Sequence, residues 1–167
     1  ALLTAARKGG LGEAAREAWP RLDVVPFDSQ HQYMATLHDT GPDRPRVAYV
    51  KGAVERVLER CANALRADGT AAPLDSAAAH AAVESMAARG LRVLALARKE
   101  FPADAARLGH DDIASGLTFL GLQGMIDPPR PDALAAVKAC HAAGVAVKMI
   151  TGDHPSTAAA IAREFGL

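Results

Sequence analysis

The sequence predicts an α/β (α+β) protein in two parts: an antiparallel sheet flanked by helices, then a partial βαβα unit. Two observations lead to this fold class. Over roughly the first hundred residues, short segments with β-branched and aromatic residues alternate with polar or Pro/Gly breaks, as in strands joined by short loops. Beyond residue 115, nearly continuous apolar runs alternate with segments of helical spacing, which is typical of parallel strands buried on both faces.

Local patterns predict the elements of the first part. Residues 54–61 place apolar side chains on one helical face, and residues 63–73 are a polar connection. Asp75 is a good cap for the Ala-rich helix that follows, which should end at Arg89 because Gly90 can adopt the left-handed conformation. Two short helices are expected at the start, and the expected strands are Leu22–Phe27, Tyr33–His38, Arg46–Val50 and Leu91–Ala97.

The second part follows a polar, turn-rich connection, Pro102–Ser115. Its strands should be parallel, with a right-handed helical crossover. Two parallel strands cannot bury both faces or protect their edges, so this unit should need more strands than the chain supplies. We therefore predict domains at residues 1–115 and 116–167. The second should contain the strand Leu117–Ile126, the helix Pro131–Ala143, the strand Val145–Ile150 and a helix from about Pro155.

Composition argues against several function classes. Nineteen basic and nineteen acidic residues leave no net charge, so nothing attracts the chain to nucleic acid or to an anionic membrane surface. No apolar run approaches the roughly 20 residues of a membrane-spanning helix, so we expect a soluble fragment. The helical pattern starts at Ala1 without a capping residue, which we interpret as a trimmed chain. Cys61 and Cys140 lack metal-ligand spacing and fit buried thiols in a reducing compartment.

Two loops of the second part carry groups suited to phosphate chemistry. In an open parallel sheet, ligands lie at the carboxyl ends of the strands. There the first strand ends in Asp127-Pro128-Pro129-Arg130 and the second in Thr151-Gly152-Asp153, ahead of a helix N-terminus that favours anions. These groups would suit a phosphate with its magnesium. The spacing fits a structural role equally well, with Asp153 capping the last helix and the two prolines starting the previous one.

Three residues of the first part are candidates for ligand binding. Lys51 ends a strand just before Gly52 and a helix, so its ammonium group could point into a cleft. Phe27 follows a strand at a turn and could offer an aromatic platform to a flat ligand. Arg92 is a charge within an apolar strand and must reach an edge or a partner. The structural alternatives are a solvated lysine and a core phenylalanine.

Five motifs follow one another along the chain. They are Pro26-Phe27-Asp28-Ser29 followed by Met34, Lys51-Gly52-Ala53, Gly90-Leu91-Arg92-Val93-Leu94-Ala95, Asp127-Pro128-Pro129-Arg130 and Thr151-Gly152-Asp153. In type, order and approximate spacing they resemble the P-type ATPases, most of all the cation pumps related to calcium-transporting ATPases. The resemblance covers nearly the whole chain. It implies a nucleotide-binding domain with part of a Rossmann-like (haloacid-dehalogenase-like) phosphorylation domain.

The resemblance also implies ligands, partners and residue roles. The ligands would be ATP with Mg2+, and the partners the remaining phosphorylation, actuator and transmembrane domains, on the cytoplasmic side of the cell membrane. Phe27 would stack on the adenine, and Lys51 would line the deep part of the pocket with Gly52 allowing close approach. Arg92 would reach towards the phosphates. The apolar walls would be Met34 and Leu94.

On the phosphoryl side, the resemblance implies that Asp127 to Arg130 form a hinge. Thr151, Gly152 and Asp153 would serve the phosphoryl group and magnesium. The family's Asp-Lys-Thr-Gly-Thr and Gly-Asp-Gly-x-Asn-Asp segments are absent from the sequence, so we expect this chain to bind nucleotide without forming an aspartyl phosphate.

Two further departures predict weak nucleotide affinity. Gln32 stands where family members commonly have a phosphate-side lysine, and the acidic residue near the adenine amino group would precede Ala1. Two other functions stay open. One is a haloacid-dehalogenase-like phosphatase or phosphomutase, although no Asp-x-Asp segment follows an early strand and Asp111-Asp112 has the wrong setting. The other is a regulatory module that binds no nucleotide.

Overall fold

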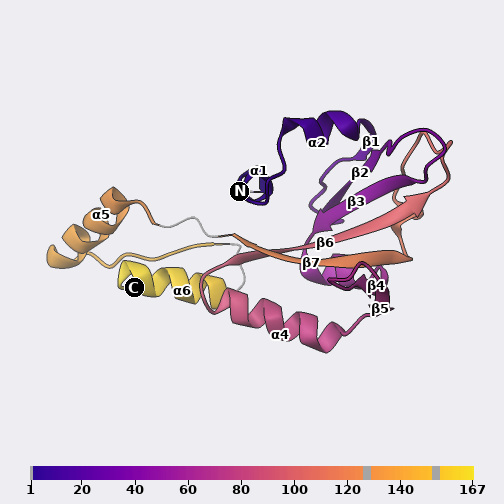
Figure 1. Ribbon diagram of the computed structural model, residues 1–167. Helices are drawn as coiled ribbons and strands as arrows, with labels where there is room; N and C mark the ends of the chain where they lie inside the picture. Colours follow the sequence, from indigo (N-terminus) through magenta and orange to yellow (C-terminus); the bar gives the residue numbers. More distant parts are fainter. Residues whose placement is uncertain (1, 126–128, 152–154) are drawn as a thin grey trace. The chain divides into compact units, whose positions relative to one another are not determined.

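The computed structural model describes residues 2–125, 129–151 and 155–167 (Figure 1). Contacts divide the chain into two compact units, one of residues 1–76 and 94–123 and the other of residues 77–93 and 124–167. A seven-stranded sheet forms the first unit together with helices, and the ends of two of its strands reach into the second. This confirms the predicted α/β class.

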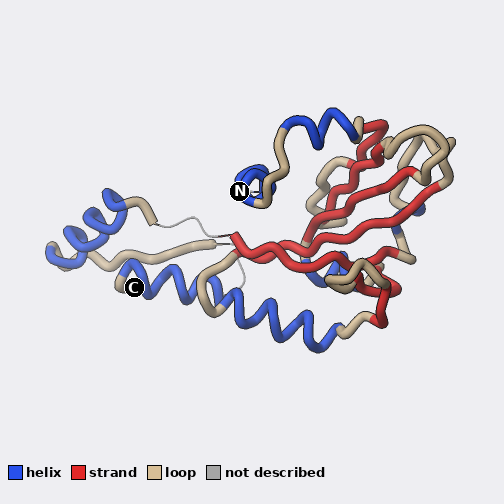
Figure 2. Tube along the Cα trace, viewed as in Figure 1, coloured by secondary structure: helices blue, strands red, loops and turns tan. Residues whose placement is uncertain are grey.

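The sheet has the strand order β1-β2-β3-β6-β7-β4-β5 (Figure 2). The pairs β1–β2, β2–β3, β3–β6 and β4–β5 are antiparallel, whereas β4 and β7 are parallel, so the sheet is mixed. Its strands are β1 (Arg21–Val25), β2 (Tyr33–His38), β3 (Arg46–Gly52), β4 (Cys61–Leu65), β5 (Ala71–Pro73), β6 (Arg92–Phe101) and β7 (Leu117–Met125).

Alternating burial along β2 separates the two faces of the sheet. Tyr33, Ala35 and Leu37 are each at most 1% exposed, while the residues between them are only half-buried. Because successive side chains point to opposite faces of a strand, one face is the core and the other is open. We call these the core face and the open face. On β3, Val50 and Ala48 lie opposite Ala35 and Leu37 and belong to the core face.

The helices confirm most of the expected pattern. The Ala-rich helix ends near Gly90, whose φ of 75° is the left-handed conformation that favours glycine. Among the described helices, none is both long and apolar enough to cross a membrane. The helices are α1 (Leu2–Lys8), α2 (Glu13–Ala18), α3 (Val54–Leu58), α4 (Ser76–Ala87), α5 (Pro131–Ala142) and α6 (Pro155–Phe165), with a 3-10 helix at Asp111–Ile113.

Residues 61–73 differ from the prediction, because they form the β4–β5 hairpin rather than a helix end and a polar connection. The hydroxyl and backbone N–H of Thr70 both donate to Asp68 Oδ1 and close the turn. Cys61 begins β4, its thiol donates to the Val57 carbonyl at 3.1 Å, and burial raises its pKa to about 11. Local composition could not reveal these strands, because β4 is ordered by pairing with the distant β7.

The prediction of two parallel strands in the second part is also wrong. Strand β7 lies between β6 and β4 in the large sheet, and residues 145–150 form no strand. Ile150 is 96% exposed and Val145 53%. A strand needs a neighbouring strand to form hydrogen bonds with its backbone N–H and C=O groups, and no described strand pairs with residues 145–150.

Residues 102–115 are packed rather than a free connection. Leu108 and Ile113 are buried, and the Leu108 N–H donates to Asp23 Oδ2 at 2.9 Å. Lys99 Nζ donates to the carbonyls of Asp112 and Ser115 at 2.6 and 3.0 Å. These bonds attach the segment to β1 and β6.

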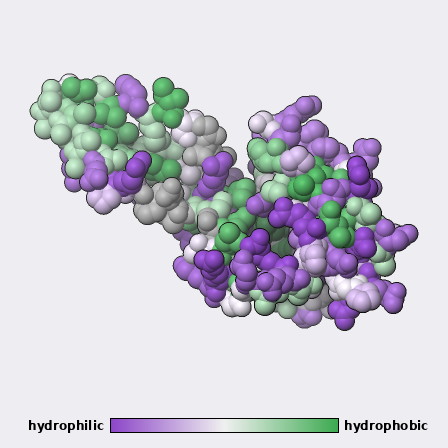
Figure 3. Space-filling view, turned by 90° about the horizontal axis from the view of Figure 1, so that it is seen from above, coloured by the Kyte–Doolittle hydropathy of each residue, from purple (hydrophilic) through white to green (hydrophobic). Residues whose placement is uncertain are grey.

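Within the second unit, α6 packs on the turn between α4 and β6. Thr157 is 4% exposed, and its hydroxyl donates to the Leu91 carbonyl at 3.3 Å. None of the α5 side chains is buried, and the space-filling view is largely green over this helical end of the chain (Figure 3). Along one face of the helix, Ala133, Leu134, Val137 and Cys140 are half-buried.

Candidate functional site

Antiparallel pairing brings the candidate residues of the first unit to one end of the sheet. The carboxyl ends of β1 and β3 and the amino ends of β2 and β6 meet there, since Val25 pairs with Ala35 and Gly52 pairs with both Tyr33 and Ala95. Phe27 follows β1 by two residues and Gln32 directly precedes β2. We call this edge the site end.

Lys51 lies among apolar side chains on the open face at the site end. It is directly opposite Met34 on β2 and Leu96 on β6. Because side chains alternate along a strand, Leu94 shares this face with Leu96. All four are half-buried, and the Lys51 ammonium makes no ion pair with a described residue. The arrangement provides an apolar surface with one available positive charge.

Gly52 has a structural reason to lack a side chain. A Cβ at this position would lie 2.6 Å from Tyr33 Cβ and 2.7 Å from Tyr33 Cα, and would also overlap the Gln32 carbonyl oxygen. Real Cβ contacts are not this short. The backbone that approaches Gly52 closely is thus that of Gln32 and Tyr33, at the start of strand β2.

Phe27 is exposed, with 62% of its surface accessible, so it is not a core residue. The loop that carries it is closed by Asp28, whose Oδ1 accepts from the backbone N–H groups of Gln30 at 2.6 Å and His31 at 3.2 Å. Hydrogen bonds from Gln30 and then His31 lower the pKa of Asp28. These hydrogen bonds close the backbone of the loop that directly follows Phe27.

Gln32 attaches this loop to β3. Its backbone φ is 59°, in the left-handed region, and its carbonyl accepts from the Ala53 N–H at 2.9 Å. Its N–H donates to the Asp28 carbonyl at 2.7 Å. The Phe27 loop and the end of β3 that bears Lys51 are therefore held together by backbone hydrogen bonds.

The described structure does not bring the remaining predicted site residues together with Phe27 and Lys51. Arg92 is exposed at the start of β6 and belongs to the second unit by its contacts. Thr151 and Arg130 are exposed. Asp127, Pro128, Gly152 and Asp153 lie outside the described residues. No group of three metal-ligating side chains occurs among the residues that were described, so the magnesium roles stay predictions.

An aromatic and cationic cluster on the core face had no signal in the sequence. The rings of His31 and His110 stack with their centroids 4.1 Å apart, and the Tyr33 hydroxyl is 2.7 Å from His110 Nδ1. The Arg60 guanidinium lies 4.7 Å from the Tyr33 ring centroid. Only tertiary folding joins residues so distant in sequence. The cluster joins His110 to Tyr33 of β2 and to His31 of the Phe27 loop.

Comparison with known proteins defines the class of this chain. Residues 1–132 match the sequence profile of the P-type ATPase cytoplasmic domain N, and the chain belongs to the P-type cation ATPase family. It is 54% identical over 168 residues to "Cation-transporting ATPase pma1" of Synechocystis sp., covering 100% of this chain and 18% of that protein.

Other relatives agree with this assignment. "Probable cation-transporting ATPase F" of Mycobacterium tuberculosis is 47% identical over 166 residues, covering 99% of this chain and 18% of the relative. "Calcium-transporting ATPase" of Bacillus subtilis is 38% identical over 171 residues, covering 100% of this chain and 19% of the relative. The chain thus spans about a fifth of the length of these relatives.

Proposed function

We propose that this chain binds ATP at the site end of its sheet and, in a full-length ion-transporting ATPase, presents it to a phosphorylatable aspartate outside this chain. The observation that carries the proposal is the exposed Phe27, whose loop is hydrogen-bonded through Gln32 to the end of β3 that bears the half-buried Lys51. Met34 and Leu94 lie on the strands that flank Lys51, on the same face of the sheet. Membership of the P-type cation ATPase family supports it.

The surroundings of Phe27 and Lys51 suit an adenine nucleotide. A purine is flat, and stacking on an aromatic ring stabilises it by about 1–3 kcal/mol per base. Met34 and Leu94 would contact the edge and remaining face of the base, while the Lys51 ammonium would favour the anionic part of the ligand. These few contacts must offset the cost of association, so we expect an affinity no better than about submillimolar.

In this proposal the chain binds the nucleotide, and an aspartate outside the chain accepts the phosphoryl group. Transfer of the γ-phosphate to an aspartate divides ATP hydrolysis into two steps that can be coupled to ion movement. A nucleotide held by its base makes that transfer a local event. Arg92, Thr151, Gly152 and Asp153 would act near the phosphates, where magnesium would neutralise phosphate charge, and Asp127 would lie in the hinge.

Titration of isotope-labelled protein with ATP or ADP tests the proposal. We expect amide resonances of Phe27, Met34 and Lys51 to shift, whereas those of the β4–β5 hairpin stay in place. A Lys51→Ala variant should bind more weakly than a variant with the exposed Lys138 of α5 replaced by alanine. If no resonance near Phe27 or Lys51 moved, the chain would be a module that does not bind nucleotide.

A further inference from the structure

Arg56 lies at the site end and contacts Gln32. It belongs to α3, which begins two residues after Gly52, and its Nε donates to Gln32 Oε1 at 3.4 Å. Gln32 itself is fixed at that edge, because its backbone carbonyl accepts from Ala53 and its N–H donates to Asp28. The side chain of Arg56 is thus directed by the same loop that carries Phe27.

The guanidinium of Arg56 has capacity for a further ligand. Its side chain is 46% exposed. One carboxylate oxygen, Glu59 Oε2, forms an ion pair with Nη1 at 3.8 Å. That distance is longer than a hydrogen bond. The two Nη groups therefore donate no hydrogen bond to a described residue.

The neighbouring arginine is engaged differently. Arg60 is 20% exposed, lies over the Tyr33 ring and donates to the Arg56 carbonyl. It is therefore part of the packed core-face cluster. Of the two arginines that follow β3, only Arg56 combines exposure with a fixed direction at the site end.

We propose that Arg56 binds the phosphate groups of the nucleotide, and that Gln32 positions it. The inference rests on the proposed function and extends it by one ligand-binding residue and one positioning residue. Guanidinium groups bind phosphate oxygens through two parallel hydrogen bonds, and such charge-assisted bonds are stronger than neutral ones. Lys51 precedes Gly52 and Arg56 follows it by four residues, so two positively charged residues lie close in sequence at the site end.

A series of nucleotides separates phosphate recognition from base recognition. Affinities for adenosine, AMP, ADP and ATP would be measured by isothermal titration without added magnesium, so that only the chain's own cations face the phosphates. Arg56→Gln should weaken ATP binding by about tenfold, the usual size for one charge-assisted bond, and leave adenosine unchanged. The ATP affinity of Arg56→Gln should also depend less on salt concentration.

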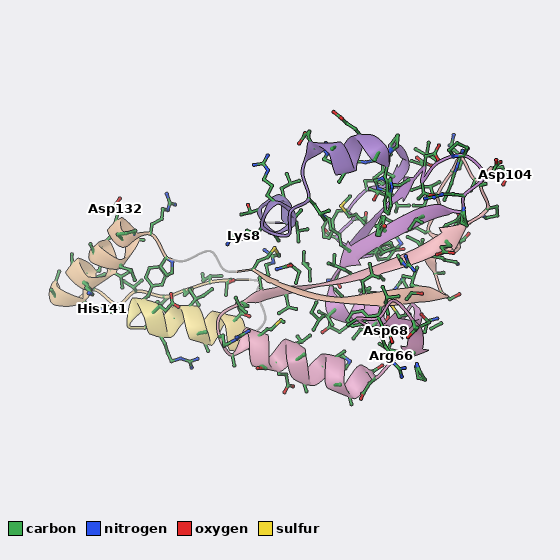
Figure 4. The ribbon with its side chains drawn as sticks, viewed as in Figure 1. Lys8, Arg66, Asp68, Asp104, Asp132 and His141 are labelled. Atoms are coloured by element: carbon green, nitrogen blue, oxygen red, sulfur yellow. The ribbon has the colours of Figure 1, made fainter. Side chains whose placement is uncertain are left out.

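A matched control is Arg66→Gln. Arg66 is an exposed arginine at the β4–β5 turn, beside Asp68 (Figure 4). This variant removes the same charge from the chain and should bind every nucleotide like the unchanged protein. Arg56→Lys keeps the charge without the planar pair of donors and should bind ATP with intermediate affinity.

The positioning role of Gln32 has its own readout. Gln32→Leu removes the acceptor of the Arg56 bond and should weaken ATP binding about threefold, less than loss of Arg56 itself. Because Gln32 acts through Arg56, the double variant should match Arg56→Gln alone. Additive losses would overturn the positioning role.

The outcomes distinguish this inference from the proposed function. If adenosine binds and Arg56→Gln binds ATP as tightly as the unchanged protein, the role of Arg56 is overturned and adenine binding stands. Equal losses for adenosine and ATP would also overturn it, because the substitution would then affect the base site. If neither adenosine nor ATP binds the unchanged protein, the proposed function fails first.

Discussion

At the scale of single residues, an exposed aromatic ring distinguishes the candidate site from an ordinary sheet edge. Phe27 keeps 62% of its surface accessible although its loop is closed by hydrogen bonds to Asp28. Removing a large apolar side chain from water stabilises a protein. A hydrogen-bonded loop that leaves the Phe27 ring exposed therefore fits a ligand that covers this ring.

Replacing Phe27 by alanine should weaken adenine-nucleotide binding by about 1–3 kcal/mol, the usual contribution of base–aromatic stacking. Thermal stability should change little, since the ring is exposed. The control is Leu11→Ala, because Leu11 is similarly exposed at 58% and lies in the loop between α1 and α2. Dissociation constants for ADP would be compared by titration. Equal affinities in both variants would exclude a stacking role for Phe27.

Asp23 should make stability depend on pH. Hydrogen bonds from the Leu108 N–H, then from Val24, lower the pKa of its carboxyl group. A lowered pKa means that the stabilisation is complete above the ordinary carboxyl value and is lost as the pH falls through the folded value. Asp23→Asn should therefore be less stable at neutral pH, with a difference that narrows below about pH 4 and disappears in stronger acid.

The measurement for Asp23 is urea unfolding at a series of pH values. Asp104→Asn serves as the control, since Asp104 is exposed in the same connecting segment and makes no hydrogen bond with a described residue (Figure 4). If the difference in stability between Asp23→Asn and the unchanged protein stayed constant from neutral to strongly acidic pH, the Asp23 carboxylate would not stabilise the packing of residues 102–115.

At the scale of elements, the tight contact of β2 with β3 determines the geometry of the site end. Gly52 allows the Gln32 carbonyl to reach the Ala53 N–H, and this bond holds the Phe27 loop beside Lys51. A side chain at Gly52 would force the two strands apart. The glycine therefore affects the ligand site through the sheet.

Gly52→Ala should destabilise the protein by about 1–3 kcal/mol, the usual cost of overpacking. Nucleotide affinity should fall in the same variant, because the Phe27 loop would shift. Gly12→Ala is the matched control, since no atom lies within 4 Å of a Cβ at Gly12. Chemical denaturation would be followed by fluorescence of the tryptophan Trp19. Equal stability of the two variants would contradict the predicted overlap with Tyr33.

At the scale of the whole molecule, β7 belongs to the same sheet as the strands of the first part. Leu117 is fully buried, and β7 lies inside the sheet between β6 and β4. The change of pattern in the sequence predicts a domain boundary near Ser115. Such a boundary would separate β7 from its neighbours β6 and β4.

A chain that stops after Ser115 should fail to fold cooperatively, whereas one that stops after Arg130 should retain the sheet. Removal of β7 exposes the edges of β6 and β4 and takes the fully buried Leu117 out of the core. Thermal unfolding by circular dichroism and the dispersion of amide resonances would compare the two chains. Identical, cooperative unfolding would place the boundary near Ser115 after all.

The sequence by itself determined the strands β1, β2, β3 and β6, the end of α4 at Gly90, and the motifs that indicate the family. These depend on neighbours in sequence: alternation, helical spacing, turn residues and the conformational freedom of glycine. Only the tertiary structure decided the partners of β7, the β4–β5 hairpin, the stacking of His31 on His110 and the contact of Arg56 with Gln32. Such pairings depend on which distant segments the fold brings together, and no local pattern encodes them.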